Sequence, residues 1–487
     1  MNAALRRVAV AVMVMVVALL ANATYVQVIT ADSLRADPRN SRVLLDEYSR
    51  QRGQISAGDQ VLAISEASDD RYKFVRRYPS DPEAFAPATG IYSLQYGSSG
   101  LERAEDPVLN GSDNRLFGRR FFDLVSGRDP RGGNVVTTLN PAMQQVAYEQ
   151  LTAKGYSGSV VAIEPSTGKI LTMVSTPSFD PGTLSSHDLP AVAKQWDDLN
   201  SDPSQPMLNR AVNQTYEPGS TFKVVVTAAA LAKGVKPDKQ VTADPVKTYE
   251  GVPLENYARE RCGPGPTVTL LEAFAKSCNT AFADLGIEVG ASALTSQAAD
   301  FGIGSNAPSI PIQVADSRVG SIDGDSAIAQ SSIGQLNVSL TPLQNAIIAA
   351  TVANGGIRMQ PHLVAQLQGP DLSTLSTIAP QTVQQAMEPD VAATLTDMMI
   401  EAEKYAGGAN AIPGVQIASK TGTAEHGSDP RNTPPNTWYI AFAPAANPTI
   451  AVAVIVEDGG NSGLSATGAS VSAPIGRAVI KAGLQGR

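Results

Sequence analysis

Apolar and polar positions change their period several times along the chain. Residues 8–28 are almost continuously apolar, whereas residues 31–140 are polar and broken, with short strand-like runs such as 60–65. The β-rich apolar runs 158–163 and 170–174 are separated by a turn composition and predict a hairpin. Residues 134–139, before that hairpin, also read as a strand. Later segments follow the helical period over 222–231, 270–286 and 340–353, and the end of the chain reads as strands over 437–442 and 449–456 and as a last helix over 473–484.

Strands at both ends of a region with helices between them predict an α+β domain whose sheet is assembled from distant segments. The length of 487 residues is about three times that of a typical domain. We therefore predict three parts: residues 1–30, an irregular small domain over 31–145, and a large α+β domain over 146–487.

The N-terminal apolar run is long enough for one bilayer crossing, which takes about 20 residues. Arg6 and Arg7 precede it, and the positive-inside rule then places the bulk of the chain on the extracytoplasmic side of the cell membrane. A cleaved signal peptide is the alternative, because Ala21-Asn22-Ala23 resembles a cleavage site. We favour the single-pass anchor, since the apolar run continues beyond that site.

Composition excludes two classes of function. A formal net charge of −9 has the wrong sign for a protein whose main partner is nucleic acid. The two cysteines and three histidines are scattered without ligand spacing, so we expect no metal site.

Three short motifs carry the candidate chemistry, in this order: Ser220-Thr221-Phe222-Lys223, Ser277-Cys278-Asn279 and Lys420-Thr421-Gly422. Two other runs match by letters alone. Ser166-Thr167-Gly168-Lys169 lies in the predicted hairpin turn, and Ser112-Asp113-Asn114 lies in a Gly/Asp-rich loop before every candidate nucleophile. Ser220, in contrast, opens an apolar helix, so Lys223 falls one turn later on the same face.

That spacing suits nucleophilic catalysis. A serine hydroxyl must be activated by a neighbouring base, and Lys223, if desolvated beside the cationic Lys420, would accept its proton as a neutral amine. Ser277 can relay a proton to a leaving amine, and Asn279 can bind a peptide carbonyl and position Lys223. Lys420, predicted on an edge strand, can bind a substrate carboxylate. Gly422 would let a substrate backbone approach that strand.

The three motifs together resemble those of the serine penicillin-recognising enzymes. The resemblance continues over most of residues 146–487. It is carried by the runs 158–165, 168–171, 209–211, 216–220, 333–335, 340–344 and 353–356. Residues 52–56 and 138–140 resemble the stem of class B penicillin-binding proteins, although Ser56-Ala57-Gly58 and Asn140 depart from the usual stem pattern.

The resemblance implies a penicillin-binding transpeptidase fold, with a five-stranded antiparallel sheet flanked by helices, an all-helical subdomain and a non-catalytic stem like the dimerisation domain of these proteins. It also implies an oxyanion hole from the backbone N–H groups of Ser220 and Thr423, and substrate binding by Asn279, Lys420, Thr421, Gly422 and Thr423. No cofactor is implied. The expected partners are peptidoglycan stem peptides, β-lactams and, by analogy with the family, a glycan-polymerising membrane protein.

The expected function is cross-linking of stem peptides by a D,D-transpeptidase with a Ser220 acyl-enzyme. The alternatives are a D,D-carboxypeptidase or endopeptidase, which would share the motifs, a β-lactamase, which the stem disfavours, and a catalytically silent penicillin sensor or scaffold. In an exported domain, Cys262 and Cys278 are predicted to form a disulfide that ties a loop to the Ser277 segment; two separate buried thiols are the alternative.

Overall fold

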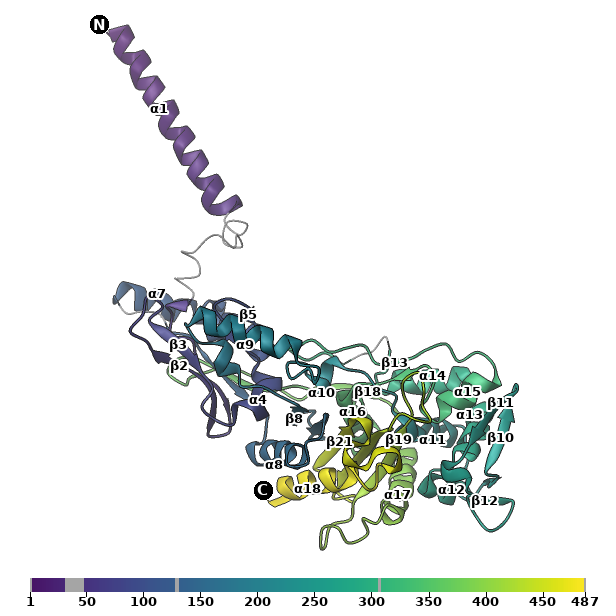
Figure 1. Cartoon of the computed structure of the whole chain (residues 1–487). Coiled ribbons are helices and arrows are strands. Elements are labelled where there is room, and N and C mark those ends of the chain that lie inside the picture. Colours follow the sequence, from purple (N-terminus) through teal and green to yellow (C-terminus); the bar gives the residue numbers. More distant parts are fainter. Residues whose placement is uncertain (1, 31–47, 128–130, 305–307, 486–487) are drawn as a thin grey trace.

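The computed structural model of the chain describes residues 2–30, 48–127, 131–304 and 308–485. The N-terminal helix α1 (Asn2–Thr24) extends away from the rest of the molecule (Figure 1). The apolar segment Ala3–Gln27 has 25 residues and none of it is buried against the protein. About 20 apolar residues suffice for a bilayer crossing, so this one helix is consistent with single-pass membrane anchoring.

The stem is built on a six-stranded sheet in the order β17-β16-β6-β1-β2-β3. Its strands are β1 (Ile55–Ala57), β2 (Gln60–Ala67), β3 (Phe74–Arg77), β6 (Asn134–Thr137), β16 (Val364–Gln368) and β17 (Thr374–Thr377). Only the β1–β6 pair is parallel. The hairpin β16–β17 comes from the part of the chain that we predicted to be catalytic, so residues 364–377 complete the sheet of the preceding domain.

Short elements cover this sheet and connect it to the second one. They are α4 (Pro82–Thr89), β4 (Tyr92–Ser93), β5 (Gly97–Ser98), α5 (Gly100–Ala104), α6 (Asp106–Leu109), α7 (Phe117–Val125) and α8 (Pro141–Thr152). Asn140, which departs from the usual stem pattern, caps α8: its side chain accepts a hydrogen bond from the backbone N–H of Met143.

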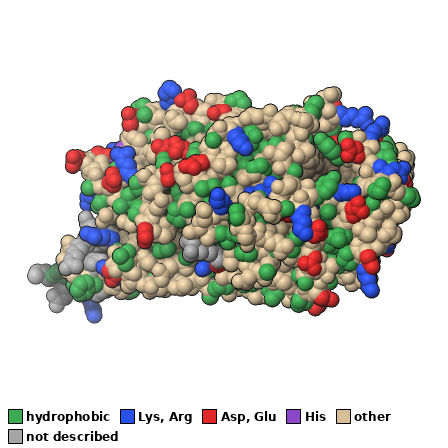
Figure 2. Space-filling model, turned by 90° about the horizontal axis from the view of Figure 1, so that it is seen from below, with side chains coloured by type: hydrophobic (Ala, Val, Ile, Leu, Met, Phe, Trp, Pro, Cys, Tyr) green, Lys and Arg blue, Asp and Glu red, His purple; other side chains and the backbone are tan. Residues whose placement is uncertain are grey.

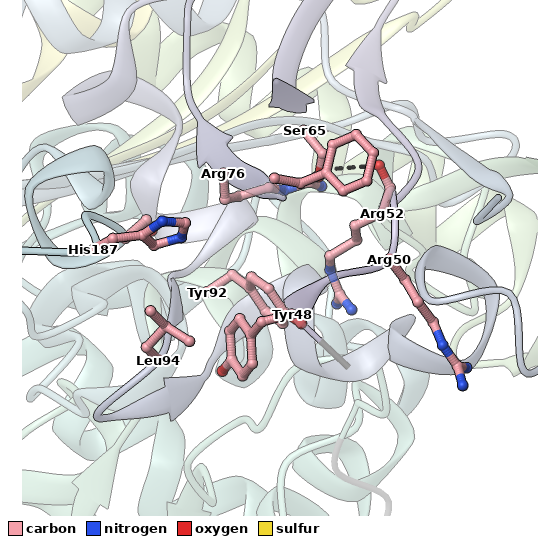
Figure 3. A pocket seen from close by; sticks show the side chains of 10 residues that line it. Tyr48, Arg50, Arg52, Ser65, Arg76, Tyr92, Leu94 and His187 are labelled. Carbon is pink, nitrogen blue, oxygen red and sulfur yellow. Dashed lines mark hydrogen bonds between the residues drawn. The ribbon is translucent and has the colours of Figure 1, made fainter. Parts of the chain in front are cut away.

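A buried ion cluster fixes the core of the stem. Arg52 Nε lies 2.7 Å from Glu102 Oε2, and Arg76 Nε lies 2.6 Å from Glu102 Oε1. Burial alone would raise the pKa of Glu102, but the two guanidinium groups hold it below its usual value. Figure 3 shows both arginines lining a small pocket together with Tyr48 and Tyr92. Because a buried charge without its partner is costly, all three members of this cluster are needed together.

The second sheet has five antiparallel strands in the order β19-β20-β21-β7-β8, as predicted. Their bounds are β7 (Gly158–Ile163), β8 (Ile170–Thr176), β19 (Ala418–Ala424), β20 (Asn436–Ala443) and β21 (Ile450–Val456). Strand β19 lies at the edge. Both faces are covered: α8 and α18 (Ser472–Gln485) pack on one, and α16 (Pro342–Ala353) packs on the other. Burial on both faces explains why these strands read as continuous apolar runs.

The region between β8 and β19 is mainly helical. Its helix α9 lies beside the stem, and most of the other elements extend to the right in Figure 1. It contains α9 (Leu189–Ser201), α10 (Arg210–Asn213), α11 (Lys223–Ala232), α12 (Leu270–Lys276), α13 (Asn279–Val289), α14 (Ala291–Asp300), α15 (Asp325–Ser332) and α17 (Pro389–Tyr405). Four two-stranded pairs are interspersed: β9 (Gln240–Thr242) with β12 (Thr267–Thr269), β10 (Val246–Tyr249) with β11 (Val252–Glu255), β13 (Arg318–Val319) with β14 (Val338–Ser339), and β15 (Ile357–Met359) with β18 (Thr382–Gln385).

One predicted helix is broken. Residues 270–286 were expected to be continuous, but Ser277 has φ +64° and ends α12, and α13 starts at Asn279. A left-handed residue cannot continue a right-handed helix. The break therefore falls within the second motif.

Candidate active site

The nucleophile candidate lies on a tight turn that precedes a buried helix. Ser220 is in a turn of 3₁₀ helix, Gly219–Phe222, and Lys223 is the first residue of α11. Ser220 is partly exposed, whereas Lys223 is fully buried. In the described part of the chain the Ser220 hydroxyl makes no hydrogen bond. The Ser220 side chain is therefore accessible from solvent, whereas Lys223 is excluded from it.

The amino group of Lys223 is held by the broken helix. Its Nζ lies 2.7 Å from Ser277 O, 2.8 Å from Asn279 Oδ1 and 3.2 Å from Ser277 Oγ. The Asn279 amide is oriented because its Nδ2 donates to Glu255 O at 2.9 Å. Three oxygens therefore surround the amino group, and the neutral amine can donate to two of them.

Lys420 contacts Ser277 from the edge strand of the sheet. Its Nζ lies 2.9 Å from Ser277 Oγ and 3.1 Å from Thr421 O. The Ser277 hydroxyl thus contacts both amino groups. The left-handed conformation of Ser277 places its carbonyl and its hydroxyl on the same lysine, which explains why the helix breaks here.

Both lysines have lowered pKa values. Burial, and then the charge of Lys420, lower the pKa of Lys223 well below its usual value, and burial lowers the pKa of Lys420 to about 7. Aromatic rings supply part of that desolvation: Lys223 Nζ lies 5.4 Å from the centre of the Phe282 ring, and Lys420 Nζ lies 5.7 Å from that of Phe274. Two ammonium groups sharing one hydroxyl would repel each other, so Lys223 loses its proton first while Lys420 keeps most of its charge below about pH 7.

Glycines let the nucleophile turn pack against its neighbours. Gly334, at φ +75°, is so close that a Cβ there would lie 2.0 Å from Gly219 O. A Cβ on Gly422 would lie 2.9 Å from Pro218 O and 3.0 Å from Trp438 Cβ. The room beside Gly422 is therefore filled by the nucleophile turn, a reason for glycine that differs from the substrate approach expected from the sequence.

The turn is also tied to the sheet by its backbone. Gly219 N donates to Gly334 O at 2.9 Å, and Trp438 Nε1 donates to Glu217 O at 2.9 Å. A Cβ on Gly219 would lie 3.0 Å from Thr423 O, so Ser220 and Thr423 come from adjoining segments.

A second buried cluster supports the edge strand from behind. Ser419 Oγ and Tyr439 OH both donate to Glu403 Oε2, and Arg477 Nε lies 2.8 Å from Glu403 Oε1. Neighbouring residues of a strand point to opposite faces, so Ser419 faces this cluster while Lys420 faces Ser277. Sequence reasoning missed Glu403 because nothing in its local pattern distinguishes it from other helix carboxylates.

A disulfide closes the loop beside the second motif. Cys262 and Cys278 are bonded, with 6.0 Å between their Cα atoms. Cys278 precedes α13 directly and lies between Ser277 and Asn279. The bond thus ties the two residues that hold Lys223 to a loop outside the helical pair.

The other Ser-x-x-Lys and Ser-Asp-Asn runs lie elsewhere. Ser166 is in the turn between β7 and β8, where Lys169 lies 3.7 Å from Glu164. Ser112 is in the stem, immediately before Asp113 caps the next turn. Four motif residues therefore meet through hydrogen bonds, Lys223, Ser277, Asn279 and Lys420, and Ser220 lies one turn before Lys223, while these decoys do not join them.

A serine at a helix start, a buried lysine one turn later and a second lysine on the edge of a five-stranded sheet define the serine penicillin-recognising class. Residues 158–481 match the model of the penicillin-binding protein transpeptidase domain, and residues 52–135 match that of the penicillin-binding protein A dimerisation domain. The chain belongs to the penicillin-binding protein transpeptidase family.

The similarity to particular relatives covers the whole chain. The chain is 60% identical to the peptidoglycan D,D-transpeptidase PbpA of Mycolicibacterium smegmatis over 100% of this chain and 99% of the relative. It is 59% identical to PbpA of Mycobacterium tuberculosis over the full length of both. The ceftriaxone acyl-enzyme structure of M. tuberculosis penicillin-binding protein A superposes with a TM-score of 0.89 at 58% identity, covering 91% of this chain and 100% of that one. The penicillin G acyl-enzyme structure of the same protein gives 0.86 at 57% identity, over 90% and 100%.

Proposed function

We propose that this peptidoglycan D,D-transpeptidase works through an acyl-enzyme on Ser220. Ser220 Oγ attacks the carbonyl carbon between the two terminal D-alanines of a donor stem peptide. The peptide C–N bond breaks, D-alanine leaves, and the amine of an acceptor peptide then attacks the ester to form the cross-link and release Ser220. The position and burial of Lys223 carry this proposal, because a fully buried lysine with a lowered pKa, one turn after Ser220, can act as a neutral base.

The proton follows the hydrogen bonds. Lys223 takes the proton of Ser220 as the ester forms. Ser277 Oγ, in contact with both amino groups, passes a proton to the leaving nitrogen of D-alanine. In deacylation the same groups act in reverse and remove a proton from the acceptor amine.

Substrate binding falls to the edge strand and the second motif. Lys420, with Thr421 and Thr423 beside it on β19, binds the terminal carboxylate, and Gly422 keeps the strand close to the nucleophile turn. Asn279 binds the donor peptide. The N–H groups of Ser220 and Thr423 stabilise the oxyanion, an arrangement that the contact between Gly219 and Thr423 O supports.

β-Lactams supply the test of the nucleophile. The relatives from M. tuberculosis form acyl-enzymes with ceftriaxone and penicillin G. Intact-mass measurement after penicillin G should show one adduct, and peptide mapping should place it on Ser220. Ser220→Ala should form none, whereas Ser166→Ala, the matched control at the other Ser-x-x-Lys run, should be acylated like the native protein. An adduct that persists in Ser220→Ala would disprove the assignment.

Product analysis separates cross-linking from hydrolysis. With a disaccharide pentapeptide donor and an acceptor amine, a transpeptidase gives cross-linked dimer, whereas a D,D-carboxypeptidase or endopeptidase gives shortened or cleaved peptide only. A scaffold would give neither, and the assembly of all five catalytic side chains argues against that role.

The chain division and topology belong to the same proposal. Residues 1–30 are assigned to the cytoplasmic tip and anchor, residues 31–145 to the non-catalytic stem and residues 146–487 to the transpeptidase domain, except that the hairpin β16–β17 joins the stem sheet. Arg6 and Arg7 precede the anchor, which supports an extracytoplasmic catalytic domain. A glycan-polymerising membrane protein would supply the strands, and co-purification from crosslinked membranes tests that partner. Protease protection of the catalytic domain in inside-out vesicles tests the sidedness.

A further inference from the structure

Helix α7 carries an exposed apolar side. Its sequence, Phe-Gly-Arg-Arg-Phe-Phe-Asp-Leu-Val, groups the apolar positions on one arc and the charged positions on the other at the helical period. Phe117, Phe122 and Val125 are 58%, 63% and 71% exposed. A surface helix of a soluble domain normally turns such an arc towards the core.

One residue of the polar arc is held by the protein. Arg119 forms an ion pair with Asp371 in the turn that joins β16 and β17. The next residue of that turn, Leu372, is also 67% exposed. Phe117, Phe122 and Val125 together are called the apolar face. On the side of the molecule seen in Figure 2, hydrophobic side chains are dispersed among polar and charged ones.

The apolar face lies where the chain arrives from the anchor. The segment that contains α7 is tied at both ends to the first described residues of the stem: Gly53 N donates to Leu109 O at 2.8 Å, and Gly132 N donates to Gln51 O at 2.9 Å. Figure 1 shows α7 at the same end of the molecule as the anchor. Only 17 residues, 31–47, join the anchor segment to Tyr48, a length that spans at most about 60 Å.

We propose that the apolar face docks on the bilayer that holds α1. An amphipathic helix with Phe and Val on one side partitions into the lipid interface, and tethering to the anchor raises its effective concentration there. The polar arc is neutralised in part by Asp371, so apolar burial rather than charge drives the contact. The bilayer is favoured over a second copy because the anchor guarantees a lipid surface within reach of every chain.

Spin labelling of the full chain tests the contact. Cys262 and Cys278 are bonded, so a nitroxide attached to Phe122→Cys is the single label. The protein is placed at one copy per nanodisc of neutral phosphatidylcholine, and Tyr405→Cys, at a position 64% exposed on the other domain, is the matched control. Unchanged penicillin acylation verifies that both variants are folded.

The label at 122 should collide with a water-soluble nickel chelate about threefold less often than the label at 405, and more often with oxygen, which concentrates in lipid. Adding Val125→Asp should return the label at 122 to water. Equal nickel collision rates at the two positions would overturn the proposal. Exclusion of both probes in single-copy discs would also overturn it, because the label would then be packed within the protein. Shielding that appears only with two copies per disc would overturn it as well, because it would indicate a dimer interface.

Discussion

Replacing Lys420 by Met should stabilise the protein while abolishing acylation. The pKa of Lys420 is about 7 in the folded state and has a reference value of 10.5. At pH 7 the folded chain holds this proton only about half of the time, whereas the unfolded chain holds it firmly, and the difference costs about 4 kcal/mol. Met fills similar space without this cost. The lost hydrogen bonds to Ser277 Oγ and Thr421 O offset about 2 kcal/mol, which leaves a net gain of about 2 kcal/mol.

The free energy of unfolding depends on pH through Lys420. Between about pH 7 and 10.5 the unfolded state binds more protons at this site than the folded state, so the stability of the native protein rises with pH in that window. The advantage of Lys420→Met should thus shrink by about 2 kcal/mol between pH 7 and pH 9.

Urea unfolding followed by the fluorescence of Trp438, which is buried in the neighbouring strand, measures this difference in a Trp196→Phe background. Lys194→Met, at a lysine whose side chain is 78% exposed, is the control and should leave stability unchanged. If Lys420→Met is no more stable than the native protein at pH 7, or if its advantage grows towards pH 9, the assignment of Lys420 as a desolvated cation is wrong.

Three further predictions concern the same site. The rate of Ser220 acylation by penicillin should rise with pH as Lys223 loses its proton and fall above about pH 7 as Lys420 does, and Lys420→Arg should remove the descending limb, as stopped-flow measurements would show. Gly334→Ala should slow acylation at least tenfold with little change in far-UV circular dichroism, because its Cβ would meet Gly219 O at 2.0 Å; a native rate would contradict the packing of the turn. Cys262→Ala with Cys278→Ala should lower the free energy of unfolding by about 3 kcal/mol, since the bond closes a loop over 16 positions. An unchanged urea midpoint would show that the bond does not constrain the unfolded chain.

The sequence alone separates the candidate motifs from their decoys, because each lies in a different local context. Ser220 opens an apolar helix and Ser166 sits in a turn, and that contrast alone separated the motif from its decoy. The edge position of β19 and the five-stranded sheet also agree with the prediction. Two cysteines left two interpretations open, because spacing along a chain does not determine the distance between two side chains in the fold.

Other features depend on contacts between distant segments. The left-handed Ser277 breaks a run whose apolar period continues unchanged, because the tertiary requirement of Lys223 overrides local propensity. Gly334 belongs to a run that resembles the family, but its role follows only from its contact with Gly219. The hairpin β16–β17 has an ordinary strand pattern, and nothing in that pattern states which sheet it joins.

That hairpin has a consequence for how the molecule is made. Thr138 Oγ1 donates to His362 O across 224 positions, and β6 pairs with β16 just beyond. A ribosome therefore releases β6 long before its partner strand exists, and the growing chain carries an open strand edge through the synthesis of most of the catalytic domain. Open edges recruit other strands. The stem cannot be completed as an independent module, and the last steps of its assembly await the arrival of residues 364–377.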